Sequence, residues 1–251
     1  MSRSLILGGT KGLGRSLALE SAWRGLEPII VGRSVEQARK DPAFATFSHR
    51  LMKADLSDPF SLLGAMPGPL WQDITHVFWV AGIFARKPLV RMTVEEMRQM
   101  INTHLYGPLG TLAFLHRLQL NSRPLADPPG QPYHLVVIAS TSSWKIRENE
   151  ALYCALKAAK AHFTRNFARE LVTDLPGSKV TLVNPGGIKT PNFWQDTDQA
   201  MDKFMEPDEL AQVIWNQVQA QTEPFLELQI PRDDQGHPEV IRGPQAPDQP
   251  F

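Results

Sequence analysis

The chain has 251 residues, with 26 basic and 26 acidic side chains and a single cysteine, Cys154. A formal net charge of zero excludes the strong field that draws basic proteins to nucleic acid or to acidic membrane surfaces. One cysteine cannot form an internal disulfide or a thiolate metal site, and no apolar run approaches the roughly twenty residues of a membrane span. We therefore expect a cytoplasmic protein without a bound metal, whose partner is a small molecule rather than nucleic acid or membrane.

Short β-rich runs alternate along the chain with longer segments of helical spacing. The predicted strands are Ser4–Leu7, Pro28–Val31, His49–Lys53, His76–Val80, His134–Ala139, Val180–Val183 and Leu226–Ile230. The predicted helices include Leu13–Arg24, Val94–Arg117, Asn149–Leu171 and Asp208–Gln221. Most strands are nearly continuous apolar runs, as strands covered on both faces are, and their alternation with helices indicates βαβ units. The expected fold class is α/β: a doubly wound Rossmann fold with a seven-stranded, mostly parallel sheet in a single domain.

Two segments interrupt this alternation. Asn121–Pro132 is dense in Pro, Asp and Gly, and predicts a surface loop between a long helix and the next strand. Residues 232–251 are polar, rich in proline and weakly periodic, which predicts a tail whose order depends on a neighbouring subunit. Residues 1–231 are therefore expected to form the single folded domain.

A glycine-rich turn follows the first predicted strand, and a helical pattern follows the turn. Glycines at such a position let backbone N–H groups approach a pyrophosphate, whose charge is favoured by the helix N-terminus. A glycine cluster also forms ordinary tight turns, but the order strand, glycine turn, helix and strand is that of a dinucleotide fold. We therefore assign cofactor contacts to the turn residues Gly8, Thr10, Lys11, Gly12, Leu13 and Gly14.

The end of the second predicted strand indicates which dinucleotide is bound. The stretch Val31 to Ser34 has no acid where an NAD site usually presents Asp or Glu to the ribose hydroxyls. The guanidinium of Arg33 and the ammonium of Lys11 instead match a 2′-phosphate. The sequence therefore predicts NADP(H), with Arg33 and Ser34 among its contacts. The alternative is that both cations are ordinary solvated surface charges.

Further motifs lie after the third, fourth and sixth predicted strands. They are Asp55 with Leu56, Ala81 with Gly82, and Pro185, Gly186, Ile188 and Thr190. In this order they resemble the short-chain dehydrogenase/reductase (SDR) family, over nearly the whole chain. The resemblance implies that Asp55 contacts the adenine, that Ala81 and Gly82 let the cofactor pass closely, and that the last group holds the nicotinamide carboxamide. The chain departs from the family in carrying Trp79 and Val80 where two asparagines usually stand.

The resemblance also implies a catalytic group. Ser140 lies thirteen residues before Tyr153, and Lys157 lies four residues after it, which is the family's spacing. On a helix, residues four apart share a face, with Cβ atoms roughly 5–6 Å apart. An ammonium about 5 Å from a phenolate stabilises it by roughly 3 kcal/mol. We therefore expect Lys157 to lower the pKa of Tyr153 from its ordinary value of about 10 toward neutrality. The resemblance implies that Lys157 also binds the nicotinamide ribose.

One catalytic position departs from the family pattern. Counting forward from Gly82 and backward from Gly107 places the family's active-site Asn at His104. Asn102 lies two residues away, which turns it about 200° around a helix. We expect the imidazole of His104 to replace that Asn and to hold a water next to Lys157. The alternative is that His104 is an ordinary packed helix residue.

These residues predict an oxidoreductase that transfers a hydride between NADP(H) and a carbonyl or alcohol carbon of a small molecule, with Tyr153 as general acid/base. The segment 191–206 is the expected substrate wall, and its apolar residues, together with Trp144, favour an apolar or aromatic substrate. They are Phe193, Trp194, Phe204 and Met205. The resemblance further implies a homodimer or homotetramer. The alternative function is an NADP(H)-binding sensor or regulatory protein without turnover.

Overall fold

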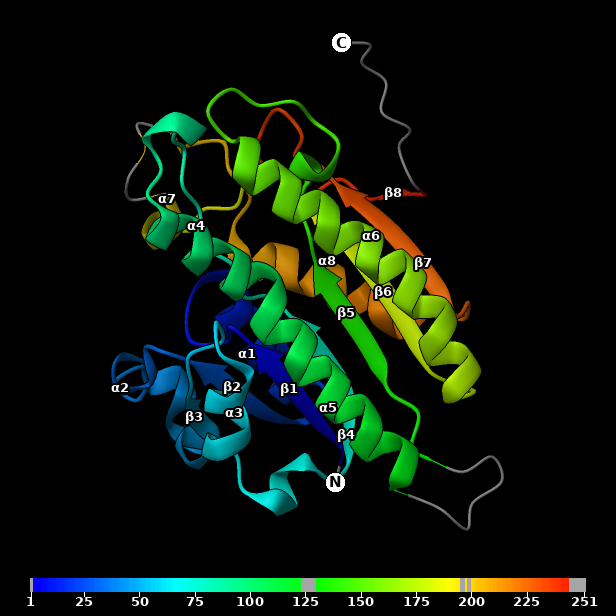
Figure 1. The fold of residues 1–251 in the computed structure, drawn as a ribbon. Helices are drawn as coiled ribbons and strands as arrows, with labels where there is room; N and C mark the ends of the chain where they lie inside the picture. The colour runs from blue at the N-terminus through cyan, green and yellow to red at the C-terminus, as the bar shows by residue number, and fades with distance from the viewer. Residues whose placement is uncertain (1, 123–129, 195–196, 198–199, 244–251) are drawn as a thin grey trace.

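A central sheet dominates the computed structural model, which describes residues 2–122, 130–194, 197 and 200–243 (Figure 1). In chain order its strands are β1 (Arg3–Leu7), β2 (Glu27–Gly32), β3 (Leu51–Lys53), β4 (Ile74–Trp79), β5 (His134–Ile138), β6 (Lys179–Pro185), β7 (Phe225–Ile230) and β8 (Ile241–Arg242). The order across the sheet is β3-β2-β1-β4-β5-β6-β7-β8. All neighbours are parallel except β7 and β8. The predicted Rossmann fold with its mostly parallel sheet is confirmed.

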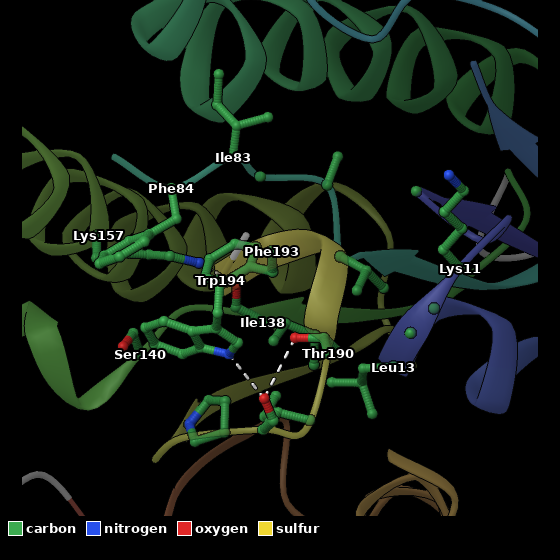
Figure 2. A pocket seen from close by; sticks show the side chains of 18 of the residues that line it. Lys11, Leu13, Ile83, Phe84, Ile138, Ser140, Lys157, Thr190, Phe193 and Trp194 are labelled. Atoms are coloured by element: carbon green, nitrogen blue, oxygen red, sulfur yellow. Dashed lines mark hydrogen bonds between the residues drawn. The ribbon is translucent and has the colours of Figure 1, made fainter. Parts of the chain in front are cut away.

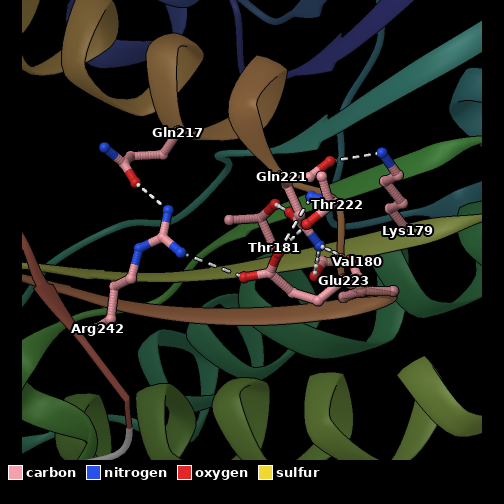
Figure 3. Close-up of polar contacts among 8 residues, drawn as sticks. All are labelled: Lys179, Val180, Thr181, Gln217, Gln221, Thr222, Glu223 and Arg242. Carbon is pink, nitrogen blue, oxygen red and sulfur yellow. Dashed lines mark hydrogen bonds and ion pairs between the residues drawn. The ribbon is translucent and has the colours of Figure 1, made fainter.

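Strand β8 lies inside the segment predicted to be a polar tail. It adds an eighth strand to the seven expected, and pairs antiparallel with β7 at Leu228 and Gln229. The Gly243 N–H also donates to the Glu227 carbonyl at 3.0 Å. Backbone pairing and the side-chain contacts of Arg242 with Glu223 and Gln217 (Figure 3) place this part of the tail, and composition indicates neither. Residues 244–251 of the tail and 123–129 of the predicted loop lie outside the described residues.

Helices cover both faces of the sheet (Figure 1). They are α1 (Gly12–Trp23), α2 (Val35–Ala38), α3 (Pro59–Ala65), α4 (Val94–Ile101), α5 (Gly107–Asn121), α6 (Ala151–Asp174), α7 (Pro191–Trp194) and α8 (Pro207–Ala220). Helices α5 and α6 pack on one face, and α1 and α8 pack on the other. Along β1, Leu5 and Leu7 point into the first layer and Ile6 into the second. Burial on both faces explains why the strands are continuous apolar runs.

The predicted helix over Val94–Arg117 is interrupted. A π-helical turn, η4 (Asn102–Tyr106), separates α4 from α5, and the Gly107 N–H donates to the Asn102 carbonyl five residues back. Pro108 gives the physical reason, because it has no N–H to donate to the carbonyl four residues earlier, that of His104. Such turns occur often at functional sites. This one carries His104.

A buried polar cluster lies near the amino ends of β5 and β6, away from the glycine turn. The Thr181 hydroxyl donates to Gln221 Oε1 at 2.5 Å, so His134 Nε2, 2.7 Å away, donates to the Thr181 oxygen. Figure 3 shows Thr181 and Gln221 in this network, with Lys179 donating to the Gln221 carbonyl. Burial and the neighbouring positive groups lower the pKa of His134 to about 3 and that of His76, stacked on it, to about 4. Both imidazoles are therefore neutral in the folded protein at neutral pH.

These two histidines should make the protein acid-sensitive. Their folded pKa values lie below the unfolded value of about 6.5, so the unfolded chain binds more protons once the pH falls below 6.5. The contribution is intact above pH 6.5 and is lost progressively as the pH falls toward the folded values. Each histidine should cost about 2 kcal/mol of unfolding free energy at pH 5.

Urea unfolding at pH 7 and pH 5 measures this effect. His134→Gln should lose about 2 kcal/mol less than the unsubstituted protein between the two pH values. The exposed His162 supplies the matched control, because His162→Gln removes no buried group. Equal losses in the unsubstituted protein and in His134→Gln would contradict the assignment.

Candidate active site

A pocket of about 870 Å³ opens at the carboxyl ends of β1 to β6. Every cofactor contact predicted from the sequence lines it: Gly8, Thr10, Lys11, Gly12, Leu13, Gly14, Arg33, Ser34, Asp55, Leu56, Ala81, Gly82, Tyr153, Lys157, Pro185, Gly186, Ile188 and Thr190. Ser140 lines it as well. The volume lies in the range of small-molecule and cofactor sites, and the carboxyl edge of a parallel sheet is where such folds bind ligands.

The glycine turn between β1 and α1 has room for little besides backbone. Gly8 has a φ of +96°, and a Cβ there would lie 2.8 Å from the Ala81 nitrogen. A Cβ on Gly14 would lie 2.1 Å from the Gly8 carbonyl oxygen. Gly8 thus permits the turn and the close approach of the segment after β4, and Gly14 lets α1 pack against the turn. Bare backbone facing the pocket at a helix N-terminus is the cradle that a pyrophosphate requires.

Two cations lie beside this turn. Arg33 is exposed at the end of β2 and Lys11 is half-buried, and both line the pocket. Within the described ranges neither forms an ion pair. Two residues after β3, Asp55 accepts a hydrogen bond from the Ser57 N–H at 3.0 Å, which orders the turn that follows the strand. The cations therefore remain available to an anionic group in the pocket.

Ser140, Tyr153 and Lys157 come together on one side of the pocket. Ser140 lies two residues after the end of β5, and the other two lie in the first two turns of α6. Tyr153 is 6% exposed and Lys157 is 4% exposed. The Lys157 Nζ donates to the carbonyls of Ala139 at 3.0 Å and Ile138 at 3.4 Å, and lies 5.6 Å from the Tyr153 ring centre. The predicted proximity of the three side chains is thus present.

The electrostatics of this group differ from the expectation. Burial raises the pKa of Tyr153, although a hydrogen bond with the Ser140 side chain opposes this, and burial lowers the pKa of Lys157 to about 7. Desolvation disfavours the charged form of each group. Lys157 therefore gives up its proton at a lower pH than Tyr153 does. The prediction that Lys157 brings the pKa of Tyr153 toward neutrality is wrong for the protein's own groups.

His104 is fully buried behind Tyr153, with ring centres 5.8 Å apart in an edge-to-face arrangement. Its Nε2 lies 2.7 Å from the Ile83 carbonyl oxygen and 3.1 Å from the Ile83 nitrogen. Burial, Lys157 and Lys160 lower the pKa of His104 well below its ordinary range, so the ring is neutral. Its Nδ1 is buried and has no hydrogen-bond partner among the described residues. His104 itself is not among the residues that line the pocket.

Aromatic side chains gather at the Tyr153 end. Phe84 lies 4.8 Å from Tyr153, 5.4 Å from Phe193 and 4.8 Å from Trp194, measured between ring centres. Figure 2 shows Phe84, Phe193 and Trp194 grouped beside Lys157 and Ser140, with Lys11 at the far end of the pocket. The aromatic side chains therefore gather at the Tyr153 end, where the charged Arg147 and Glu150 also line the pocket, and the glycine turn with Lys11 lies at the other end.

The sequence identified part of this aromatic end. Phe193, Trp194 and Phe204 line the pocket as expected, whereas Met205 and Trp144 do not. Phe84 was missed, although its place two residues after Gly82, in the segment that follows β4, was a usable signal. Positions 195, 196, 198 and 199 of the expected substrate wall lie outside the described residues.

Two other classes of site have no support in the described part of the chain. It contains no group of three or more His, Cys, Asp and Glu side chains that would hold a metal ion. None of its helices combines the length and the apolar character needed to cross a bilayer.

The known proteins that this chain is similar to are oxidoreductases. An uncharacterized oxidoreductase of Myxococcus xanthus is 30% identical over 199 residues, which cover 74% of this chain and 72% of the relative. Carbonyl reductase family member 4 of Danio rerio is 26% identical and covers 85% of this chain and 90% of its own. The solved structure of an alcohol dehydrogenase from the archaeon Thermococcus sibiricus, complexed with 5-hydroxy-NADP, superposes with a TM-score of 0.75 at 22% identity and covers 95% of this chain and 99% of that one.

A family model described as short chain dehydrogenase matches residues 3–201, a range that contains the glycine turn, β4 and the whole of α6. The motifs that suggested the resemblance thus fall within one continuous match, on the fold that the family requires. This chain belongs to the short chain dehydrogenase family of oxidoreductases.

Proposed function

We propose that this oxidoreductase transfers a hydride between NADP(H) and a carbonyl or alcohol carbon of a small molecule. The observation that carries the proposal is one pocket lined at one end by the glycine turn with Lys11 and Arg33, and at the other by Ser140, Tyr153 and Lys157. The Danio rerio relative is named as a carbonyl reductase and the archaeal neighbour as an alcohol dehydrogenase bound to an NADP derivative, which supports both the cofactor and the reaction class.

The proposed mechanism assigns each side chain a separate task. When bound, NADPH supplies the hydride. Tyr153 gives its proton to the carbonyl oxygen, and Ser140 donates a hydrogen bond to the same oxygen as negative charge develops there. The raised pKa of Tyr153 keeps the phenol protonated at neutral pH, which is the form this step needs. Protonated Lys157 stabilises the phenolate that remains, and would also hold the nicotinamide ribose.

The remaining cofactor contacts follow from the pocket lining. The glycine turn would hold the pyrophosphate, Asp55 and Leu56 the adenine, and Pro185 to Thr190 the nicotinamide carboxamide. Arg33 and Lys11 would neutralise the 2′-phosphate that distinguishes NADP(H) from NAD(H). The lack of an ion pair on either cation, within the described residues, supports this assignment.

His104 takes the place of the family's active-site Asn in this proposal. Its Nδ1 would hold a water beside Lys157, through which the lysine exchanges its proton with solvent. A buried nitrogen with no partner among the described residues supports this role, because such an atom normally has a hydrogen bond to protein or to water.

The aromatic end of the pocket supports an apolar or aromatic substrate. Exposed apolar side chains on η3 (Leu89–Arg91) and α4, such as Val90 and Val94, support the homodimer or homotetramer implied by the resemblance. The cytoplasmic location stays a prediction.

Replacing Tyr153 tests the reaction. Tyr153→Phe should lower the turnover of ketones, aldehydes or quinones with NADPH by at least about 100-fold, because general acid catalysis contributes on that scale. NADPH binding, measured by calorimetry, should stay within about twofold. Turnover that survives in Tyr153→Phe would contradict the assignment. NADPH binding without turnover of any carbonyl in the unsubstituted protein would favour the sensor.

Replacing Arg33 tests the cofactor. Arg33→Asp should reduce the preference for NADPH over NADH by roughly 10- to 100-fold, the value of a charge-assisted hydrogen bond. Steady-state kcat/KM with each cofactor gives the ratio. The matched control is Arg39→Asp, because Arg39 is an exposed arginine directly after α2 that does not line the pocket. An unchanged ratio in Arg33→Asp would show that Arg33 does not recognise the 2′-phosphate.

The pKa of Lys157 predicts a pH dependence. Its folded value is lowered to about 7, so the ammonium form predominates below pH 7 and is lost as the pH rises through that value. For carbonyl reduction, kcat/KM should therefore decline above about pH 7, since this ratio reports the groups of the free enzyme. Lys157→Met should be slower and should lack this decline. A rate for the unsubstituted protein that is flat from pH 6 to 9 would show that the charge on Lys157 is not required.

A further inference from the structure

Helix α6 carries a second buried lysine that neither the proposed mechanism nor the sequence analysis uses. Lys160 is 0% exposed and lies one turn beyond Lys157 on the same helix. Its Nζ donates to the Ala81 carbonyl at 3.0 Å and lies 4.3 Å from the centre of the Trp79 ring. The amine is thus fixed between the end of β4 and an indole face.

Stability alone does not account for this residue. Burying an amine removes it from water, and within the described residues Lys160 has no carboxylate partner that would compensate. Burial and the nearby Lys157 lower the pKa of Lys160 well below its ordinary value, which indicates a neutral amine. A methionine would fill the same space without that cost.

The Ala81 carbonyl that Lys160 holds belongs to a segment that lines the pocket. Ala81 and Gly82 line the pocket, and the Ala81 N–H donates to the Leu7 carbonyl at 2.8 Å, directly beside the glycine turn. The side chains that precede Ala81 do not fix it. Val80 is apolar, and Trp79 Nε1 is buried without a partner in the described part of the chain. Lys160 therefore supplies the side-chain hydrogen bond to this carbonyl.

The two lysines of α6 act on neighbouring strands in the same way. Lys157 Nζ donates to the Ala139 carbonyl at the end of β5, and Lys160 Nζ donates to the Ala81 carbonyl at the end of β4. Strands β4 and β5 pair directly up to Trp79 and Val137. One helix thus fastens both strand ends that face the proposed nicotinamide side of the pocket.

We propose that Lys160 is a positioning residue for the cofactor: its amine, seated over the Trp79 ring, holds the Ala81 carbonyl and so fixes the Ala81–Gly82 turn against which NADP(H) would lie. This inference rests on the proposed function for the identity of the ligand. Lys160 and Trp79 together would hold the backbone just after β4, because the side chains of β4 donate no hydrogen bond to Ala81.

The test is NADPH binding, measured by calorimetry on the full chain without a carbonyl substrate. Lys160→Met should raise the dissociation constant for NADPH about 5- to 10-fold, the usual worth of one hydrogen bond. Its melting temperature should be equal or higher. In turnover, KM for NADPH should rise while kcat at saturating NADPH stays within about twofold. If Lys160→Met does not fold, Lys160→Gln replaces it, because its side chain is one atom too short to reach Ala81.

Thr164→Val is the matched control. Thr164 is also fully buried on α6, one turn further on, and its hydroxyl donates to the Lys160 carbonyl rather than to β4. This variant should leave the dissociation constant unchanged. An unchanged constant in Lys160→Met together with a lower melting temperature would show a purely structural role and overturn the inference.

Failure of the proposed function gives a different result. If the unsubstituted protein binds NADPH but reduces no carbonyl, the proposed activity fails and the effect of Lys160 is still measured by the dissociation constants. If the unsubstituted protein does not bind NADPH, both the cofactor assignment and the role of Lys160 are overturned.

Discussion

Burial of α6 against the carboxyl ends of β4 and β5 is the constraint on which the site depends. It places two lysine amines on backbone carbonyls and removes both from water. The same burial raises the pKa of Tyr153 and lowers that of Lys157, so each group favours its neutral form. The positions of the reactive side chains are thus set by packing. Their protonation is set by the same burial, because desolvation disfavours the charged form of each group.

A second constraint links the glycine turn to this helix. Ala81, just after β4, lies between Gly8 on one side and Lys160 on the other. The next residue, Gly82, packs against the His104 ring, because a Cβ on Gly82 would lie 2.8 Å from His104 Cε1. The π-helical turn aims His104 at that place. The nucleotide end and the reactive end of the pocket therefore share one short segment of backbone. A substitution at Ala81 would alter the geometry of both ends.

The sequence predicted the features that depend on local pattern. Seven strands, the glycine turn and the i, i+4 pair of Tyr153 and Lys157 follow from periodicity and spacing, and the structure brings the predicted cofactor contacts to one pocket. The features that were missed depend on tertiary contacts. The π turn follows from Pro108, which the helical pattern concealed, and the pKa of Tyr153 is controlled by burial rather than by the nearest charge. The role of Lys160 was not visible because, without the fold, a lysine on a helix reads as a solvated charge.

The ends of the sheet have a consequence for association. An uncovered edge strand offers unpaired backbone groups to any other chain, and proteins shorten or cover such edges. Here β3 has only three residues, and β7 is capped in part by the two residues of β8. Extension of the sheet from one copy to the next is therefore disfavoured at both ends. A second molecule would meet helices instead, so contacts between copies would form without competing for the backbone that builds the nucleotide cradle.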